Sequence, residues 1–553
     1  MKNVHSKSLR TIALLLIIFA IQAIVCLYIA YQKQYLFTDE VYSYGLANSE
    51  TTAFIDPGES PELMIAWQDN SYFRNYIKFD TSRSFSFQAA FANQAKDVHP
   101  PLYYCLLHLM CAFFPNTVYS AFPGILLNVL FLFVADFLLY YITLNLTKSR
   151  ITAFSVLLFW GLSASCFSNV VLIRMYMLQT VQILAVIAYH IWKKDKSSYV
   201  LLDALELILL ICLGGLTQYY FYIFAAVFGA CICIYMLASK RFKLFVGYAA
   251  SLWAGVIMAL VIFPATIKYH LSGYRGNYAT DSIGKFTFEK FRLYDEMINK
   301  ELFAGIAKPV LFVLLACAVC KVITWATNLT VTQKEHYCEV RFTLKKLAFE
   351  EKQICLRLTE NLLLIVTALI ASAAFFYVAV QGSEIINVRY IYPVFPVVAM
   401  LIGCFFAKVL HKKAYQLICC VIALAIALLS TFTNGIDWAY LDYKNQISNA
   451  KSLQNADCVI INRADGWWNV LQAINVYIDM NEIRALNDAE LNRFQEILDE
   501  RADPSDKVCV AIPADNHYTD DEKSALLDEI LKNTSYTHYT RTYDYYTVIY
   551  TLE

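Results

Sequence analysis

The chain has 553 residues, of which 58% are apolar and only 16% are charged. Soluble globular proteins carry about 25% charged residues, so most of this chain does not face water. Its 45 basic and 45 acidic residues cancel, which excludes a simple basic nucleic-acid-binding protein. From Gly435 to the end, however, there are 21 acidic and 10 basic residues. We therefore expect an apolar body with basic flanks, followed by an acidic soluble tail.

The apolar body contains repeated stretches that are long enough to cross a bilayer as helices, which takes about 20 residues each. The first stretch is too long for a removable signal peptide, so we expect it to stay as an anchor. The sequence predicts eleven spans, near residues 11–31, 119–144, 151–168, 175–192, 200–217, 218–238, 244–268, 309–327, 361–381, 391–409 and 413–433.

The orientation of these spans follows from their short basic loops, because lysine and arginine are retained on the cytoplasmic side. With eleven spans, all the basic clusters fall on the side of the amino terminus, so we expect that terminus to be cytoplasmic. Residues 101–115 are apolar but too short to span, and counting them would invert the later loops. We expect them to form a helix in the outer leaflet. The predicted domains are a transmembrane domain, 1–433, with a first external loop at 32–100, and an extracytoplasmic domain, 434–553.

The acidic tail has the pattern of a small α/β domain. Apolar runs from Asp457, Lys507 and Thr542 predict strands. Thr519 with Glu522 is typical of a capping box at a helix start, and Asn487 begins a similar pattern. We find no glycine-rich phosphate loop in the tail.

The first external loop opens with two adjacent carboxylates, Asp39 and Glu40, just beyond the first span. Partial desolvation at a membrane surface raises the basicity of a carboxylate, so this pair is a candidate proton acceptor and cation ligand. The alternative is that both residues only cap the following helix and stay solvated.

The same loop ends in Asp97-Val98-His99-Pro100-Pro101-Leu102-Tyr103-Tyr104. Two prolines fix φ and force His99 into an extended conformation, which predicts a rigid corner at the start of the outer-leaflet helix. The alternative is a turn with an incidental histidine.

Two arginines are predicted at the outer ends of spans, Arg174 in LIRMY and Arg389 in NVRYIYP. Arginine at membrane depth needs a partner or must snorkel to the interface. If these arginines bind a ligand, phosphate suits the guanidinium fork. Tyrosines and one amide share this side, where they are candidate substrate contacts or belt residues: Tyr176, Gln218, Tyr219 and Tyr390.

Four motifs together resemble those of the glycosyltransferase C superfamily. They are the DE pair after the first span, the HPPLYY corner, the RMY segment and RYIYPVFP. The chain is most similar to family 39, the protein O-mannosyltransferase and aminoarabinose transferase type, over about residues 10–410. The resemblance implies transfer of a sugar from a polyprenyl-phosphate carrier to an acceptor on the outer side, usually with inversion. The acceptor would be a protein, a glycan or another lipid, and no nucleic acid is implied.

The hypothesis for the mechanism is a single in-line displacement with Asp39 as the base. Glu40 orients Asp39 or helps hold a divalent cation (Mg, Mn or Zn), and Asp97 and His99 bind the sugar or that cation. Arg174 and Arg389 stabilise the phosphate leaving group. Tyr103 is a further candidate substrate contact.

Two rival functions remain open from the sequence. A transporter or lipid flippase also has an apolar body, but such proteins usually show repeats with broken helices near the midplane. A non-catalytic assembly or sensor protein would use its tail to bind a partner.

Overall fold

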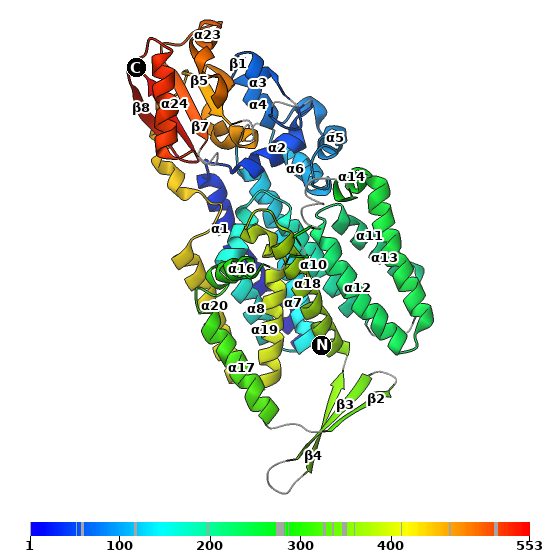
Figure 1. Ribbon diagram of the computed structural model, residues 1–553. Coiled ribbons are helices and arrows are strands. Elements are labelled where there is room, and N and C mark those ends of the chain that lie inside the picture. Colours follow the sequence, from blue (N-terminus) through cyan, green and yellow to red (C-terminus); the bar gives the residue numbers. More distant parts are fainter. Residues whose placement is uncertain are drawn as a thin grey trace.

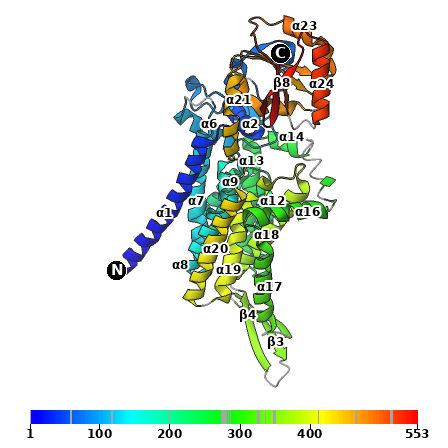
Figure 2. The ribbon, with the colours of Figure 1, turned by 90° about the vertical axis from the view of Figure 1, so that its left-hand side faces the viewer.

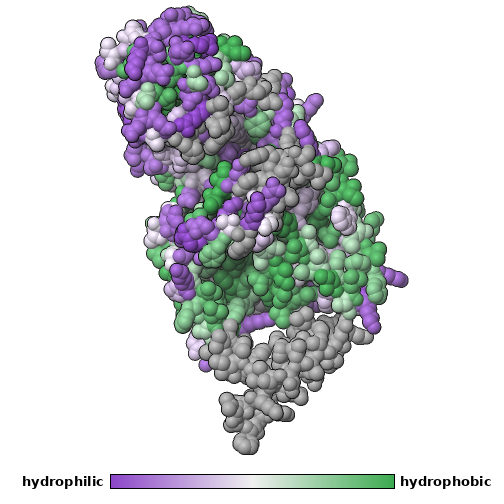
Figure 3. All heavy atoms as spheres, viewed as in Figure 1, coloured by the Kyte–Doolittle hydropathy of each residue, from purple (hydrophilic) through white to green (hydrophobic). Residues whose placement is uncertain are grey.

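The computed structural model describes residues 2–50, 52–56, 60–115, 119–194, 196, 198–271, 281–282, 284–285, 287–323, 328–334, 337–345, 351–358, 360–410, 412–463, 466–513 and 518–553. A helical bundle forms the body, and a mixed sheet with small helices lies over its upper end (Figure 1). Most of the bundle surface in Figure 3 is hydrophobic, whereas the upper domain is mostly hydrophilic. The chain is a polytopic helical membrane protein with a C-terminal mixed-sheet domain, which confirms the predicted fold class.

Helices occupy all eleven predicted spans. They are α1 (Lys2–Gln32), α7 (Phe122–Thr147), α8 (Arg150–Gly161) with α9 (Ala164–Val171), α10 (Tyr176–Lys193), α11 (Leu201–Gly215), α12 (Tyr220–Ala238), α13 (Phe242–Ile262), α17 (Ala307–Ile323), α18 (Glu360–Gly382), α19 (Phe395–Val409) and α20 (Lys413–Asn434). Within the described residues, seven helices are long and apolar enough to cross a membrane, or eight if the bent pair α8 and α9 is one span. Two of the other helices, α10 and α11, have only 18 and 15 residues.

The break between α8 and α9 bends the chain by 58°. Ser163 caps α9, because its side chain accepts a hydrogen bond from the Cys166 backbone N–H at 3.4 Å. The bend leads the chain to Val171 and Arg174, at the end of the bundle next to the C-terminal domain.

Residues 32–100, predicted as the first external loop, contain small helices that lie over this end of the bundle (Figure 1). They are α2 (Thr38–Asn48), α3 (Glu62–Ile65), α4 (Ser71–Ile77), η1 (Thr81–Arg83) and α5 (Gln88–Gln94). The short apolar segment predicted as an outer-leaflet helix is α6 (Leu102–Phe113), which packs against α2. Later connections contribute α14 (Ala265–Leu271), α16 (Phe288–Glu301), η2 (Val388–Tyr390) and η3 (Tyr392–Val394).

The C-terminal domain is built on a six-stranded sheet in the order β1-β6-β5-β7-β9-β8. Its strands are β1 (Gln68–Asp69), β5 (Asp457–Asn462), β6 (Glu482–Asn487), β7 (Val508–Pro513), β8 (Tyr539–Asp544) and β9 (Thr547–Leu552). The helical segments are η4 (Leu441–Asn445), α21 (Ile447–Ser452), η5 (Trp467–Ala473), α22 (Ile474–Tyr477), η6 (Asp488–Arg493), α23 (Phe494–Asp499) and α24 (Asp520–Lys532). Strand β5 is parallel to β6 and β7, while β1, β8 and β9 pair antiparallel.

The sequence predicted most of this domain, with two differences. The predicted single final strand is a hairpin of β8 and β9, and the first external loop supplies the edge strand β1, which pairs with β6. Thr519 forms the predicted capping box with Glu522. Because β1 belongs to the loop 32–100, the sheet ties that loop to the C-terminal domain.

At the opposite end of the bundle, a three-stranded sheet extends away from the helices (Figure 1). Its strands are β2 (Asn328–Lys334), β3 (Tyr337–Lys345) and β4 (Glu351–Leu358). This segment contains the bases that predicted a cytoplasmic loop. The amino terminus lies at the same lower end, since α1 descends from the C-terminal domain and diverges from the bundle (Figure 2).

Candidate active site

A buried ion pair fixes the start of α2 beneath the C-terminal domain. Lys33 follows α1 and donates through Nζ to Glu40 Oε1 at 2.6 Å and to the Val171 carbonyl at 3.1 Å. Neither side chain is exposed. Burial lowers the pKa of the Lys33 ammonium from its usual value, and Glu40 offsets part of that effect. The pair therefore joins the ends of α1 and α9 to the first turn of α2.

Both carboxylate oxygens of Glu40 are used by the protein. Oε1 also accepts from the Ile173 backbone N–H at 2.9 Å, and Oε2 accepts from Phe37 N–H at 2.8 Å, as a residue at the third position of a helix can do. The sequence alternative that Glu40 caps the helix is thus correct in part, but the residue is buried instead of solvated. Its contacts suit positioning of the neighbouring Asp39.

Asp39 lies next to Glu40 in the first turn of α2 and has a different partner. Its Oδ2 forms an ion pair with Arg389 Nη1, and its side chain keeps 27% exposure. Asp39 is therefore the accessible member of the DE pair, and its carboxylate contacts one of the two predicted arginines.

Arg389 lies in an aromatic pocket at the start of η2. Its guanidinium carbon is 5.8 Å from the Phe37 ring centroid, 5.3 Å from that of Tyr390 and 5.8 Å from that of Trp438. Only 7% of its side chain is exposed. The anionic Asp39 and cation–π contacts offset the cost of burying this charge.

Arg174, from the junction of α9 and α10, meets the same turn of α2. Its Nη1 donates to the Asp39 carbonyl at 3.2 Å, to Ser43 Oγ at 3.3 Å and to Tyr104 OH at 3.1 Å. The Arg174 guanidinium is buried, so these contacts hold it in one orientation. The structure thus brings Asp39, Glu40, Arg174 and Arg389 to one end of the bundle, away from the amino terminus.

The proline corner supplies a support for Arg174. His99 Nε2 lies 3.4 Å from Arg174 Nη2, and His99 Nδ1 lies 2.9 Å from Asp97 Oδ2. Arginine only donates, so His99 must accept at Nε2 and carry its hydrogen on Nδ1. Burial raises the pKa of the Asp97 carboxyl, but His99 and Arg174 lower it by more, so it lies below its usual value. Asp97 and His99 thus form a second layer behind Arg174.

The remaining predicted residues divide into three groups. Tyr176 and Tyr390 contact each other, with ring centroids 6.1 Å apart, beside Arg389. Gln218 and Tyr219 lie at the α11–α12 junction, where Gln218 Oε1 accepts from Tyr219 N–H at 2.6 Å. Tyr103 is fully buried, and its contact with substrate stays a sequence prediction.

Several residues of the site were not predicted. Tyr104, and not Tyr103, contacts Arg174, since one residue along a helix turns the side chain by about 100°. Ser43 is one helical turn after Asp39, so that spacing was a usable signal. Trp438 gave no sequence signal, because its contact with Arg389 joins remote segments. Lys33 was also not predicted, although its partner Glu40 is only seven residues away.

The predicted divalent cation site does not fit the geometry. Both Glu40 oxygens are committed to Lys33, Phe37 and Ile173. Across the described residues, no three or more His, Cys, Asp or Glu side chains form a group that could hold a metal ion. The proposed grouping of Glu40 with Asp97 and His99 is therefore not formed, and the cation remains a sequence prediction.

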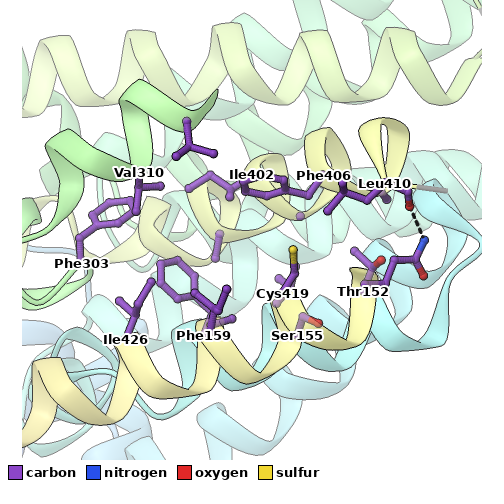
Figure 4. A pocket seen from close by; sticks show the side chains of 18 of the residues that line it. Thr152, Ser155, Phe159, Phe303, Val310, Ile402, Phe406, Leu410, Cys419 and Ile426 are labelled. Carbon is purple, nitrogen blue, oxygen red and sulfur yellow. Dashed lines mark hydrogen bonds between the residues drawn. The ribbon is translucent and has the colours of Figure 1, made fainter. Parts of the chain in front are cut away.

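An apolar groove runs down the bundle between α8, α17, α19 and α20 (Figure 4). Its volume is about 340 Å³. Phe303 and Val310 lie at one end and Leu410 and Thr152 at the other, as Figure 4 shows. A single hydrocarbon chain suits this shape and lining.

No protein-family model matches the chain, and no curated protein matches it. Among solved structures, the chain is similar to ArnT from Cupriavidus metallidurans bound to undecaprenyl phosphate, with a TM-score of 0.49 and 11% identity over 98% of each chain. It is also similar to the apo state of the same protein, with a TM-score of 0.46 and 11% identity over 92% of this chain and 96% of that one. At this identity, no site residue is transferred from these structures to this chain.

Proposed function

We propose that the protein is a membrane glycosyltransferase that moves a sugar from a polyprenyl-phosphate donor to an acceptor hydroxyl, with inversion. The observation that carries the proposal is the accessible Asp39 carboxylate bound to Arg389 beside the buried Arg174. An acid paired with one guanidinium group, in a helical turn held by a second, suits a reaction in which a base and a leaving phosphate act side by side. The end of the bundle that holds this site is extracytoplasmic in the proposal.

The two arginines bind the donor phosphate. A guanidinium fork matches phosphate oxygens, and charge grows on the phosphate as the sugar leaves. Arg389 is paired with Asp39 in the free protein, so a phosphate must take over part of that contact. Binding of the donor therefore releases Asp39, which becomes a stronger proton acceptor at the moment the donor is in place.

The reaction is one displacement at the anomeric carbon. The acceptor oxygen forms a bond to that carbon while its proton passes to Asp39. The bond between the carbon and the phosphate oxygen breaks, and its electron pair stays on the phosphate beside Arg389 and Arg174. Glu40 holds the turn that carries Asp39, while His99 and Asp97 hold Arg174.

The apolar groove is assigned to the polyprenyl chain. Its upper residues Phe303 and Ile306 follow α16, and Ala399 is about ten residues after Arg389, on the helix that leads down from η2 and η3. A chain in this groove would lie among helices while its phosphate stays at the bundle end. The donor needs no soluble nucleotide-sugar site, and the sequence has no signature of one.

The test is transfer of a radiolabelled sugar from polyprenyl phosphate by the purified protein. Release of polyprenyl phosphate, with the label in water or in an added membrane acceptor extract, supports the enzyme. Movement of intact labelled donor between leaflets of vesicles, without release of sugar, would instead support the flippase. If the protein neither transfers nor moves the donor, and binds partners only through residues 434–553, that result would support the assembly or sensor function.

A further inference from the structure

A second cavity lies at the end of the bundle away from the C-terminal domain, where α10, α11, α12, α13 and α18 meet. Its volume is about 90 Å³, or about three water molecules at about 30 Å³ each, which is the size of a phosphate group. Four cations line it, Lys193, Lys194, Lys196 and Arg241, against the two carboxylates Asp203 and Glu360.

The lysines differ in how fully they are neutralised. Lys193 is bound by Asp203 and Glu206, each at 2.5 Å. Lys196 shares Asp203 at 2.7 Å and is 44% exposed. Lys194 Nζ donates to the neutral Asn361 amide oxygen at 2.7 Å. Among the described residues around the cavity, these four cations face three carboxylates when Glu206 is included.

A second, apolar groove lies next to this cavity, between α11 and α13. The groove has a volume of about 350 Å³ and shares Tyr199 with the basic cavity. Its lining is mostly small and apolar, including Ala204, Ala250 and Ala254. The Tyr199 ring lies on Gly247, where an added Cβ would come within 2.9 Å of its Cδ1 atom. A space the size of a phosphate group and a space the size of a hydrocarbon chain therefore meet at Tyr199.

Large apolar side chains around both spaces are exposed. Leu201 is 75% exposed, Phe242 60% and Val246 62%, and such side chains are stable only against lipid or another protein. Basic cavities between transmembrane helices at a membrane surface suit anionic lipid head groups.

We propose that this composite space binds one anionic phospholipid from the leaflet on the side of the amino terminus. The lipid phosphate occupies the basic cavity beside Lys194 and Lys196, and one acyl chain lies in the groove between α11 and α13. The site is separate from the donor site at the opposite end of the bundle. It does not depend on the proposed transfer reaction, because binding alone defines it.

The test is lipid binding to the delipidated full chain, measured by native mass spectrometry with one lipid at a time. We expect phosphatidylglycerol to bind more tightly than phosphatidylcholine. The double variant Lys194→Gln/Lys196→Gln should lose about 25-fold in phosphatidylglycerol affinity, at about fivefold for each lysine near a membrane surface. Lys243→Gln is the matched control, since Lys243 is an exposed lysine of the same region that does not line the cavity.

A second variant tests the chain groove without changing charge. Ala250→Leu fills the groove and should reduce phosphatidylglycerol binding, whereas the exposed Val246→Leu should not. Equal binding of the two lipids overturns the proposal. It is also overturned if Ala250→Leu binds lipid normally and inorganic phosphate displaces phosphatidylglycerol completely, because the site would then hold a free anion.

Discussion

Replacement of Asp39 by asparagine tests the base role with little change in shape. The amide cannot take the acceptor proton, and a positioned base contributes about 10²- to 10⁴-fold to a rate. That loss corresponds to about 3–5 kcal/mol of barrier at about 1.4 kcal/mol for each factor of ten. We therefore expect transfer from polyprenyl phosphate to fall by at least a hundredfold in Asp39→Asn.

The same change also removes the anionic partner of Arg389. Breaking a buried ion pair by removing one partner costs about 3–5 kcal/mol of folding stability. Asp39 is 27% exposed, and Arg389 keeps its ring contacts with Phe37, Tyr390 and Trp438. We therefore expect a smaller loss of about 1–3 kcal/mol, after discounting for solvent and these contacts.

The assay is sugar release per folded molecule, measured well below the unfolding temperature of the variant. Asp479→Asn is the matched control, because Asp479 forms an ion pair with Arg74 at 2.9 Å with both side chains 45% exposed. An exposed pair of this kind contributes about 0–1 kcal/mol, and its loss should leave transfer unchanged. Folded Asp39→Asn protein that keeps more than half of the wild-type rate would refute the base role.

Three further outcomes follow from the contacts of the site and the groove. Glu40→Gln should cost about 3–5 kcal/mol of folding stability in thermal unfolding, because it leaves the buried Lys33 ammonium without its carboxylate. The double variant Lys33→Met/Glu40→Leu should recover part of this loss. If the stability losses of the two single changes simply add in the double variant, the pairing is contradicted. Asp97 has a lowered pKa when folded, so its stabilisation is present above about pH 4 and is lost as the pH falls through that lowered value. Unfolding temperatures of wild type and Asp97→Asn should therefore converge as the pH is lowered below about 4, and curves that stay parallel would disprove this. Ala423→Trp should fill the apolar groove between α8, α17, α19 and α20. It should weaken the binding of long-chain polyprenyl-phosphate donors much more than that of short-chain analogues. An equal effect on both would show that the polyprenyl chain lies elsewhere.

The sequence predicted the convergence of Asp39, Arg174 and Arg389 because topology alone restricts where they can be. Each follows or precedes a predicted span at the same end, so the predicted alternating order of eleven spans places all three on one side. The apolar lengths and basic loops that determine this order are local properties, and local properties can be read without the tertiary structure.

The roles within the cluster depended on tertiary contacts that the sequence does not contain. Glu40 is buried because the bent α8–α9 pair brings backbone groups to it and to Lys33. The Ile173 N–H donates to Glu40, and the Val171 carbonyl accepts from Lys33. The rotation of α6 against α2 decides which ring reaches Arg174, so the hydrogen bond is made by Tyr104 and not by the predicted Tyr103. The edge strand β1 has only two residues, too few for a periodic pattern, and only its pairing with β6 defines it.

In the proposed reaction, a donor phosphate takes the place of Asp39 at Arg389. It is tested most directly by an experimental structure of the protein with bound polyprenyl phosphate. We predict phosphate oxygens within hydrogen-bond distance of both Arg389 and Arg174, with the Asp39 carboxylate separated from Arg389 and turned toward the sugar position. An intact ion pair between Asp39 and Arg389, with the phosphate bound elsewhere, would contradict the account.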